Sequence, residues 1–378
     1  MTSDIKYMKI ALRLGQRGLG RTWPNPSVGC VIVKSPTEEG IIIGRGSTQK
    51  GGAPHAETEA INQSINVYGK DSLVDATAYV SLEPCCHHGN TPPCVNSLID
   101  AGIRRVVIGC VDPDPRVSGR GMEILKKSGM EVTIGVLQDE AERLNAGFIY
   151  KVKLGRPLVT LKVATTADGR IATKTGESKW ITGPLSRKRS HIMRSQYDAI
   201  AIGINTVFHD NPQLTCRLPG LEDRSPVRVV FDSKLAIDTQ SQILQTAGLY
   251  KTWVITSKNH EISLISKIEK YGVKIISVGL DSEGHIDLSL ALSALADRGI
   301  TRLMIEGGAT LSTSFLRANL VDLLAWFRAS SLIGDDGKPV FSNLGVEGID
   351  NMHKFKLLSH ENIGPEILDL YGRVKSIN

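Results

Sequence analysis

Long apolar runs are missing from this sequence of 378 residues. No stretch approaches the roughly 18 consecutive apolar residues that a membrane-spanning helix requires. Residues 1–15 mix charged with apolar positions, which indicates an amphipathic helix and not a secretory signal. We therefore expect a cytoplasmic protein that does not interact with membranes.

Dense basic tracts and aromatic residues are also scarce. Lys and Arg number 45 against 39 Asp and Glu, and the net charge of +6 is not gathered into the basic tract of a dedicated nucleic-acid binder. Aromatic residues make up 5% of the chain, and none stands near the motif described below to stack on a base. We expect no nucleic-acid partner, whereas the mild positive charge permits a phosphorylated ligand.

Disulfide bonds are not expected, because the six cysteines occur in a long chain without a secretory signal and several of them are clustered. Such clustering favours a metal site. Cys30 and Cys110 lie in apolar runs typical of strands and are predicted to be small core residues. With 41% hydrophobic and 22% charged residues, the composition is that of a soluble globular protein with a sizeable core.

Two segments, residues 54–57 and 84–94, indicate a zinc site. A catalytic zinc takes three protein ligands and keeps one position open, and His55, Cys85 and Cys94 are the predicted ligands. Glu57 stands two residues after the histidine, where zinc deaminases of nucleobases place a proton carrier. Those enzymes space their cysteines as Cys-x-x-Cys, but eight residues separate Cys85 from Cys94. Either the loop is enlarged or the metal is held differently.

Helix starts are predicted at both segments. Pro54 precedes His55 and a helix at 57–65, and Pro93 precedes Cys94 and a helix at 95–101. The partial positive charge of a helix N-terminus favours ionised thiolates and an ionised glutamate. Residues two apart on a regular helix point about 200° apart. His55 and Glu57 therefore cannot be ordinary same-face ligands, although a first turn can aim one at the metal and the other at its water.

Rival interpretations stay open at this point. Cys86, His87 and His88 are alternative ligands, which we rank lower because they lie inside the loop, where no helix end orients them. If Cys86 or His88 filled the fourth position, the chain would be a non-enzymatic, zinc-stapled binding module. A nucleoside or nucleic-acid deaminase with a non-catalytic C-terminal substrate domain is a second alternative.

Strands alternate with helices along the chain, which predicts mostly parallel sheets covered on both faces. In the first half, strands are expected at 28–33, 41–44, 76–81, 105–110 and 131–134, with helices at 4–17, 57–65, 95–101, 121–128 and 139–150. Lys151–Pro157 reads as a linker. In the second half, strands are expected at 158–163, 199–202, 227–231, 252–255, 274–277 and 302–305, with helices at 185–195, 288–297 and 311–319.

The second half lacks a Gly-x-Gly-x-x-Gly dinucleotide motif after a strand. The turn Glu306-Gly307-Gly308-Ala309 would cradle a phosphate on bare backbone amides, or would simply join a strand to a helix. A basic helix ending at Arg194 is ambiguous, because such a helix is usually a solvated face and only sometimes a phosphate site. Residues 198–214 are polar and rich in turns, which is typical of a ligand-binding loop.

Further motifs connect both halves to one family. In the first half they are Asn25-Pro26-Ser27-Val28-Gly29, Pro54-His55-Ala56-Glu57, Glu83-Pro84-Cys85 continuing through Gly89 to Thr91-Pro92-Pro93-Cys94, and Asp112-Pro113. In the second half they are Ala167-Asp168-Gly169-Arg170-Ile171-Ala172, Gly176-Glu177-Ser178, Trp180-Ile181-Thr182, Thr206-Val207, Asp210-Asn211-Pro212 and Glu306-Gly307-Gly308. On these motifs the whole chain resembles the bifunctional RibD/RibG family of riboflavin biosynthesis, in which the long ligand loop is normal.

The resemblance implies an α/β protein of two domains. Residues 1–151 would form a cytidine-deaminase-like, three-layer α/β/α pyrimidine deaminase that depends on zinc, and residues 152–378 a dihydrofolate-reductase-like α/β reductase that uses NADPH. The implied substrate is a phosphorylated diaminopyrimidine, which would first be deaminated hydrolytically and then reduced from ribosyl to ribityl. We also expect a homo-oligomer.

The resemblance also implies residue roles. Glu57 would be catalytic, and Asn25 would hydrogen-bond the pyrimidine. The NADPH site would be lined by Ala164, Trp180, Thr206, Asp210, Ser233, Gly308, Ala309 and Thr310. The ribosyl phosphate would be held by Ser178, Arg194, Leu214, Arg217 and Glu306, with Arg194 gripping the phosphate through two nitrogens. Lys162 and Asp210 are candidates for handling charge and protons near the ribose carbonyl.

Three departures from the family pattern stand out. Asp114 replaces a common Asn, Cys86 replaces a common Ser, and Ala329-Ser330-Ser331 replaces the usual Ala-Pro-Lys. We still expect an active reductase.

Overall fold

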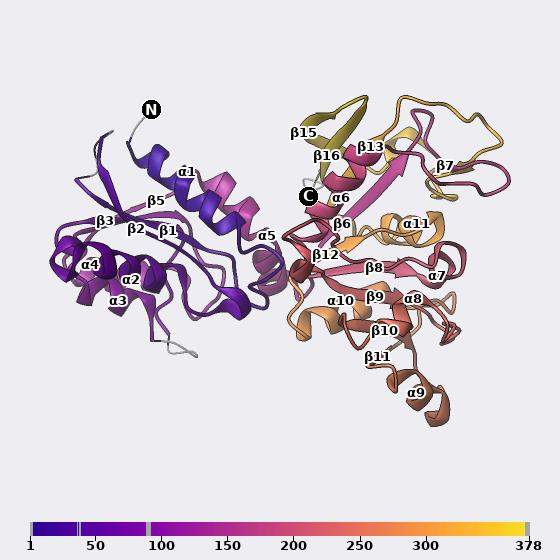
Figure 1. Cartoon of the computed structure of the whole chain (residues 1–378), viewed down its shortest axis with the longest axis horizontal. Coiled ribbons are helices and arrows are strands. Elements are labelled where there is room, and N and C mark those ends of the chain that lie inside the picture. The colour runs from indigo at the N-terminus through magenta and orange to yellow at the C-terminus, as the bar shows by residue number, and fades with distance from the viewer. Residues whose placement is uncertain (1–2, 36, 38, 88–91, 375–378) are drawn as a thin grey trace. The chain divides into compact units, whose positions relative to one another are not determined.

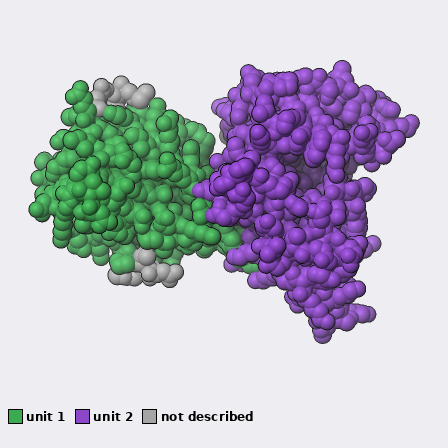
Figure 2. Space-filling view, in the orientation of Figure 1, with its two compact units in different colours: residues 1–157, 298–301 green, residues 158–297, 302–378 purple. Residues whose placement is uncertain are grey.

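The computed structural model describes residues 3–35, 37, 39–87 and 92–374. Figure 1 traces the elements in chain order. The chain divides into two compact units, unit 1 with Met1–Pro157 and Arg298–Thr301, and unit 2 with Leu158–Asp297 and Arg302–Asn378 (Figure 2). No helix in the described part of the chain is long and apolar enough to cross a membrane.

Unit 1 is a three-layer structure around a five-stranded sheet. Its strands run in the order β2-β1-β3-β4-β5, with bounds β1 Gly29–Lys34, β2 Ile41–Ser47, β3 Thr77–Leu82, β4 Arg105–Cys110 and β5 Glu131–Ile134. Its helices are α1 Ser3–Gln16, α2 Ala56–Tyr68, α3 Cys94–Asp100, α4 Arg120–Lys127 and α5 Gln138–Leu154. Helices α1 and α5 cover one face, and α2, α3 and α4 cover the other (Figure 1).

The sheet of unit 1 is mixed, whereas a mostly parallel sheet was expected. β1 pairs antiparallel with both β2 and β3, and only β3, β4 and β5 run parallel. The cause is the short connection between β1 and β2, because a parallel pair needs a crossover of a dozen or more residues. The prediction for Cys30 and Cys110 is confirmed, since both are core residues with 0% and 2% of their surface exposed.

Two glycines of β2 let α2 lie against the sheet. A Cβ atom on Gly46 would stand 2.0 Å from the carbonyl oxygen of Ala56, and one on Gly44 would stand 2.3 Å from that of Ala60. Any side chain at either position would push the helix away. The contact at Gly46 fixes the first turn of α2, which follows directly after His55.

Unit 2 is built on a nine-stranded sheet in the order β11-β10-β9-β8-β12-β6-β13-β16-β15. The seven strands from β11 to β13 are parallel, and β16 and β15 add an antiparallel edge. The strands are β6 Leu158–Thr165, β8 Ala199–Gly203, β9 Val227–Phe231, β10 Thr252–Ser257, β11 Val273–Val278, β12 Arg302–Ile305, β13 Leu323–Arg328, β15 Phe355–Ile363 and β16 Glu366–Arg373. A separate two-stranded ladder joins β7 Arg170–Ala172 to β14 Lys338–Pro339.

The helices of unit 2 connect the parallel strands. They are α6 Pro184–Arg194, α7 Ile204–Asp210, α8 Gln242–Gln245, α9 Ile262–Glu269, α10 Leu288–Asp297 and α11 Ala309–Arg317. Short 3₁₀ turns occur in both units, at Lys50–Gly52 and Lys70–Leu73 in unit 1 and at Glu222–Arg224 and Ile349–Asn351 in unit 2.

The structure departs from the predicted elements in two ways. The expected linker Lys151–Pro157 begins as helix, because α5 continues to Leu154 and ends at Gly155, whose φ of 65° closes the helix. The prediction also omitted α7, α8, α9, β7 and the strands β13 to β16. Most residues of β15 are exposed, so this strand lacks the buried apolar pattern on which the other strands were predicted.

Candidate active sites

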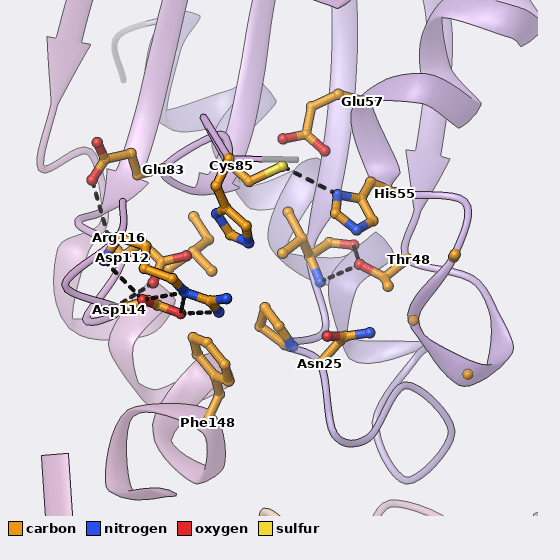
Figure 3. Close-up of a pocket in the computed structure, with 17 residues that line it drawn as sticks. Asn25, Thr48, His55, Glu57, Glu83, Cys85, Asp112, Asp114, Arg116 and Phe148 are labelled. Carbon is orange, nitrogen blue, oxygen red and sulfur yellow. Dashed lines mark hydrogen bonds and ion pairs between the residues drawn. The ribbon is translucent and has the colours of Figure 1, made fainter. Parts of the chain in front are cut away.

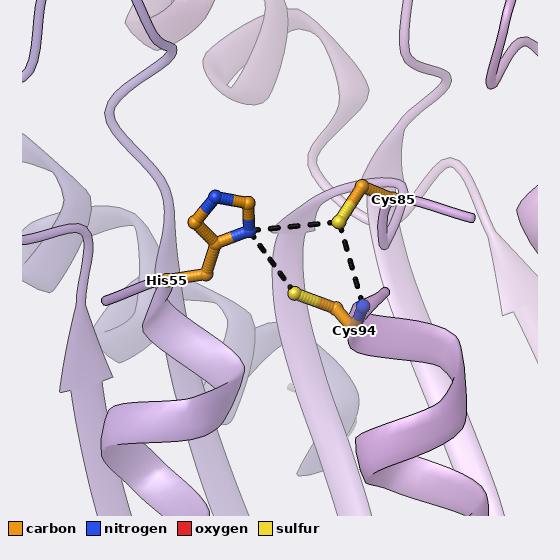
Figure 4. Close-up of side chains that lie close together, drawn as sticks. All are labelled: His55, Cys85 and Cys94. Atoms are coloured by element: carbon orange, nitrogen blue, oxygen red, sulfur yellow. Dashed lines mark hydrogen bonds between the residues drawn. The ribbon is translucent and has the colours of Figure 1, made fainter. Parts of the chain in front are cut away.

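The structure brings His55, Cys85 and Cys94 together (Figure 4). His55 Nδ1 lies 3.2 Å from Cys94 Sγ and 3.5 Å from Cys85 Sγ. The three side-chain ligand atoms all lie within 4.8 Å of one another. Cys85 follows β3, His55 caps α2 and Cys94 opens α3, so two helix N-termini meet at the cluster as predicted.

The backbone at the start of α2 explains how both His55 and Glu57 reach the same pocket. His55 is extended, with φ −75° and ψ 162°, and the helix begins only at Ala56. The 200° separation expected on a regular helix therefore does not apply. At the start of α3, the Cys94 backbone N–H donates to Cys85 Sγ at 3.4 Å, which stabilises a thiolate at that sulfur.

Electrostatics within the cluster favour a thiolate as well. Hydrogen bonds from Cys94 and His55 lower the pKa of the Cys85 thiol far below its ordinary value, although burial opposes them. The hydrogen bond to Cys85 and burial raise the pKa of Cys94. The hydrogen bond to Cys85 raises the pKa of His55.

This donor set fits zinc. One imidazole nitrogen and two sulfurs within mutual reach are the ligands that zinc deaminases use, with the fourth position left for water. Glu57 is 3% exposed, and burial raises its pKa to about 7, with the Cys85 thiolate contributing. A carboxyl group with that pKa accepts and releases a proton near neutral pH.

A pocket of about 310 Å³ opens beside the cluster. Figure 3 shows His55, Glu57 and Cys85 on one side of it and Asp112, Asp114 and Arg116 across from them. Asn25, the predicted pyrimidine ligand, and Phe148 also line the pocket. Its volume is within the range of small-molecule sites.

The wall opposite His55 was not predicted as part of the site. Buried Glu83 holds it by accepting backbone N–H bonds from Asp112 at 3.3 Å, Gly119 at 3.0 Å and Met122 at 3.2 Å. Burial raises the pKa of Asp112 to about 7. The Asp112-Pro113 motif was visible in the sequence, but nothing local shows that it faces a zinc cluster.

The rival ligands do not join the cluster in the described part of the chain. The Cys86 thiol donates to the Arg116 carbonyl oxygen at 3.4 Å. His87 lines the pocket, and its buried Nδ1 has no hydrogen-bond partner among the described residues. His88, Gly89, Asn90 and Thr91 lie outside the described residues.

In unit 2, Glu306 is held between two cations. It follows β12, and its carboxylate accepts from Arg194 Nε at 2.9 Å and from Arg194 Nη2 at 2.8 Å, while Lys162 Nζ lies 3.9 Å away. Burial alone would raise the pKa of Glu306, but Arg194 and Lys162 lower it to about 2. Burial lowers the pKa of Lys162.

The predicted grip of Arg194 on a phosphate differs from what the structure shows. Two nitrogens of its guanidinium bind Glu306, and the third, Nη1, donates to the Thr215 carbonyl oxygen at 3.1 Å. The bidentate face of Arg194 is therefore used by Glu306. The backbone N–H of Arg217 donates to His191 Nδ1 at 3.3 Å, and its Nη1 to Thr215 Oγ1 at 3.4 Å.

Four neighbouring strands of the sheet, β9, β8, β12 and β6, have a predicted NADPH residue at or just after their carboxyl ends. In this order they supply Ser233, Thr206, Gly308 and Ala164. Gly308 caps the start of α11, which continues with Ala309 and Thr310, and its N–H donates to Thr206 Oγ1 at 3.3 Å. Ligands of parallel sheets bind at this edge, and a helix N-terminus accepts phosphate, so these residues fit a dinucleotide phosphate.

The remaining predicted residues of unit 2 are more dispersed. Asp210 ends α7, and Leu214 is buried with a φ of 56°. Trp180 is 69% exposed and stacks on the guanidinium of Arg187, 4.3 Å from its ring centre. Ser178 precedes it in the same loop and accepts the Ile181 backbone N–H at 3.2 Å.

Comparison with known proteins connects both sites to one family. A model of the cytidine and deoxycytidylate deaminase zinc-binding region matches residues 1–110, and a model of the RibD C-terminal domain matches residues 157–368. The riboflavin biosynthesis protein RibD of Actinobacillus pleuropneumoniae is 42% identical over 97% of this chain and 94% of its own length.

Solved structures agree over the whole chain. Form 1 of Acinetobacter baumannii RibD has a TM-score of 0.86 and 35% identity, and covers 99% of both chains. A diaminohydroxyphosphoribosylaminopyrimidine deaminase/5-amino-6-(5-phosphoribosylamino)uracil reductase from Thermotoga maritima has a TM-score of 0.85 and 37% identity, and covers 98% of this chain and 99% of its own.

The two predicted domain classes, a zinc-dependent deaminase and an NADPH-dependent reductase acting on a phosphorylated pyrimidine, are thus confirmed, together with the cofactors Zn²⁺ and NADPH. Neither rival interpretation accounts for a full-length match that includes the reductase. The chain belongs to the RibD family, the bifunctional deaminase/reductases of riboflavin biosynthesis.

Proposed function

We propose that the two reactions are divided between the two units, with deamination in the pocket beside His55 and reduction at the carboxyl edge of the sheet in unit 2. The proposed deaminase domain is residues 1–151 and the proposed reductase domain is residues 152–378, whereas the compact units divide after Pro157, beyond the end of α5. The observation that carries the proposal is the placement of buried Glu57 in the same pocket as the His55 and Cys85 members of the metal cluster.

In the deaminase, His55, Cys85 and Cys94 are the zinc ligands. Zinc, when bound, supplies a Lewis acid that lowers the pKa of water in the open position. Glu57 accepts a proton from the attacking water and returns it to the ring and to the leaving ammonia, a transfer typically worth a factor of roughly 100 to 10,000 in rate. Asn25 hydrogen-bonds the pyrimidine ring and orients it. Water is consumed and ammonia is released.

In the reductase, NADPH when bound would supply a hydride to C1′ of the ribosyl group. The bond from C1′ to the ring oxygen breaks, that oxygen takes a proton, and the sugar opens to a ribityl chain that stays attached to the pyrimidine amine. Lys162, whose pKa is lowered by burial, would donate the proton that the released ring oxygen takes, or stabilise negative charge on it. Between turnovers, the negative charge of the Glu306 carboxylate offsets the positive charges of Lys162 and Arg194.

The predicted binding residues of unit 2 complete the reductase site. Ser178, Arg194, Leu214, Arg217 and Glu306 hold the ribosyl phosphate substrate. Ala164, Trp180, Thr206, Asp210, Ser233, Gly308, Ala309 and Thr310 hold NADPH. Because Arg194 is engaged by Glu306, Arg217 is the better placed of the two arginines to take the phosphate.

We also propose that the chain works in the cytoplasm as a homo-oligomer and has no nucleic-acid or membrane partner. All six cysteines are free thiols, and thiolate ligands persist in a reducing compartment. The mild net charge of +6 favours small anionic substrates over polyanions.

The pair Cys85→Ser and Cys86→Ser tests the assignment of the metal centre. Each variant loses one thiol from the same loop, but only Cys85 belongs to the cluster. Cys85→Ser should lose most of its zinc and its ammonia release from the diaminopyrimidine phosphate. Cys86→Ser should retain both. Metal analysis and an ammonia assay give the readouts, and NADPH oxidation with the deaminated intermediate reports the second site separately. Equal zinc loss in the two variants would remove Cys85 from the proposed ligand set.

A further inference from the structure

The deaminase pocket is poor in positive charge. Four carboxyl groups line its described part, those of Glu57, Glu83, Asp112 and Asp114, whereas Arg116 is the single Lys or Arg side chain among the described lining residues. The ligand loop at 86–93 contains no Lys or Arg in its sequence. The substrate nevertheless carries a phosphate, and carboxylates repel that group. Arg116 is therefore the natural counterion for it.

The geometry of Arg116 leaves one edge of its guanidinium for a ligand. Asp114 occupies the other edge, with Nε 3.0 and 3.1 Å from its two carboxylate oxygens and Nη2 2.6 Å from Oδ2. Among the described residues, Nη1 has no recorded hydrogen bond. Nη1 and the outer proton of Nη2 form the parallel pair of donors that a phosphate accepts bidentately.

The position of Arg116 suits the outer end of the substrate. Its side chain is 68% exposed and reaches into the pocket opposite His55 and Asn25 (Figure 3). A pyrimidine ring placed beside Glu57 would leave its ribosyl phosphate directed toward solvent, where a charged group keeps part of its hydration.

The support for Arg116 is rigid. Asp114 also accepts the Arg116 backbone N–H at 2.9 Å, and its own N–H donates to Asp112 Oδ1 at 2.8 Å. Asp112 in turn is tied to buried Glu83 at 3.3 Å. An arginine held in advance loses less conformational entropy when it binds its ligand.

We propose that Arg116 binds the phosphate of the deaminase substrate at the mouth of the pocket and so selects the phosphorylated pyrimidine over the unphosphorylated riboside. The inference rests on the proposed deaminase function of unit 1. It adds a specificity residue that the motifs of the ligand loop do not contain.

The test compares two substrates on the full-length, zinc-loaded protein, namely the diaminopyrimidine ribosyl phosphate and its dephosphorylated riboside. In Arg116→Gln, KM for the phosphorylated substrate should rise about tenfold or more, the size of one hydrogen bond to a charged group, with kcat nearly unchanged. KM for the riboside should not change. Arg116→Lys should fall between the wild type and Arg116→Gln, because it keeps the charge but loses the paired donors.

Lys126→Gln is the matched control, since Lys126 is an exposed residue of α4 and does not line the pocket. The substitution removes one positive charge, as Arg116→Gln does. It should leave both KM values unchanged. An unchanged KM for the phosphorylated substrate in Arg116→Gln, or an equal rise for both substrates, overturns the inference while wild-type ammonia release still supports the deaminase. If the wild type released no ammonia from the phosphorylated substrate, the function proposed for unit 1 would fail instead.

Discussion

Glu306 is a buried carboxylate whose charge is maintained by Arg194 and Lys162, and its stability contribution should depend on pH. Its pKa is lowered from 4.5 to about 2 in the folded protein. Because the pKa of Glu306 is lower in the folded than in the unfolded protein, its ionised form stabilises the fold. This stabilisation is fully present above the unfolded pKa, near 4.5, and is lost as the pH falls toward about 2. Glu306→Gln removes the titrating charge. The gap in unfolding free energy between wild type and Glu306→Gln should narrow by about 2 kcal/mol from pH 6 to pH 3 in urea titrations.

Glu361→Gln is the control for that titration. Its carboxylate pairs with Arg189 but is 46% exposed, so its gap to the wild type should vary far less with pH. A gap for Glu306→Gln that stays constant from pH 6 to pH 3 would contradict the ion-pair account.

At the level of residues, the sequence identifies the metal cluster better than the rest of the site. His55 and Cys94 each follow a proline at a helix start, so local signals place them. The pair Arg194 and Glu306 is separated by 112 positions, and no local pattern reports such a contact. The phosphate role of Arg194 came from the family resemblance, and the ion pair with Glu306 appears only in the structure.

The contact between β2 and α2 positions the start of the metal site, and Gly46 makes it possible. Gly46→Ala would place a Cβ atom 2.0 Å from the Ala56 carbonyl oxygen, so the helix start must shift. We expect a loss of about 1 to 3 kcal/mol in unfolding free energy and weaker zinc retention during dialysis.

Gly248→Ala provides a matched control in unit 2, because a Cβ atom there meets nothing within 4 Å. It should change stability by less than about 0.5 kcal/mol and leave zinc bound. If Gly46→Ala behaved like Gly248→Ala in both assays, the close packing of α2 on β2 would not determine the site.

At the level of elements, buried strands were the most predictable. The predicted bounds of β4, β9 and β12 agree with the structure, because these strands are mostly apolar and buried inside a sheet. The bounds of the partly exposed edge strand β5 agree as well. The hairpin of β15 and β16 was missed, although the two-residue turn Gly364-Pro365 between its strands is a recognisable signal. The edge strand β15 is mostly exposed, so no buried apolar pattern marks it in the sequence.

For the whole molecule, the two-domain organisation followed from the sequence because each half carries its own alternation of strands and helices. The sequence did not predict that the β1–β2 connection makes the first sheet mixed, nor that residues 298–301 group with unit 1. The identity of the reductase cofactor required the family resemblance, since the second half has no dinucleotide motif of the usual form.

The central claim is that one chain carries two separable active sites, and Glu57→Gln tests it most directly. Glutamine preserves the shape of the side chain but cannot carry the proton. The variant should retain zinc and lose ammonia release by a factor of roughly 100 to 10,000. It should still oxidise NADPH at the wild-type rate when given the deaminated intermediate. Ammonia release at the wild-type rate, or loss of both activities with zinc still bound, would contradict the account.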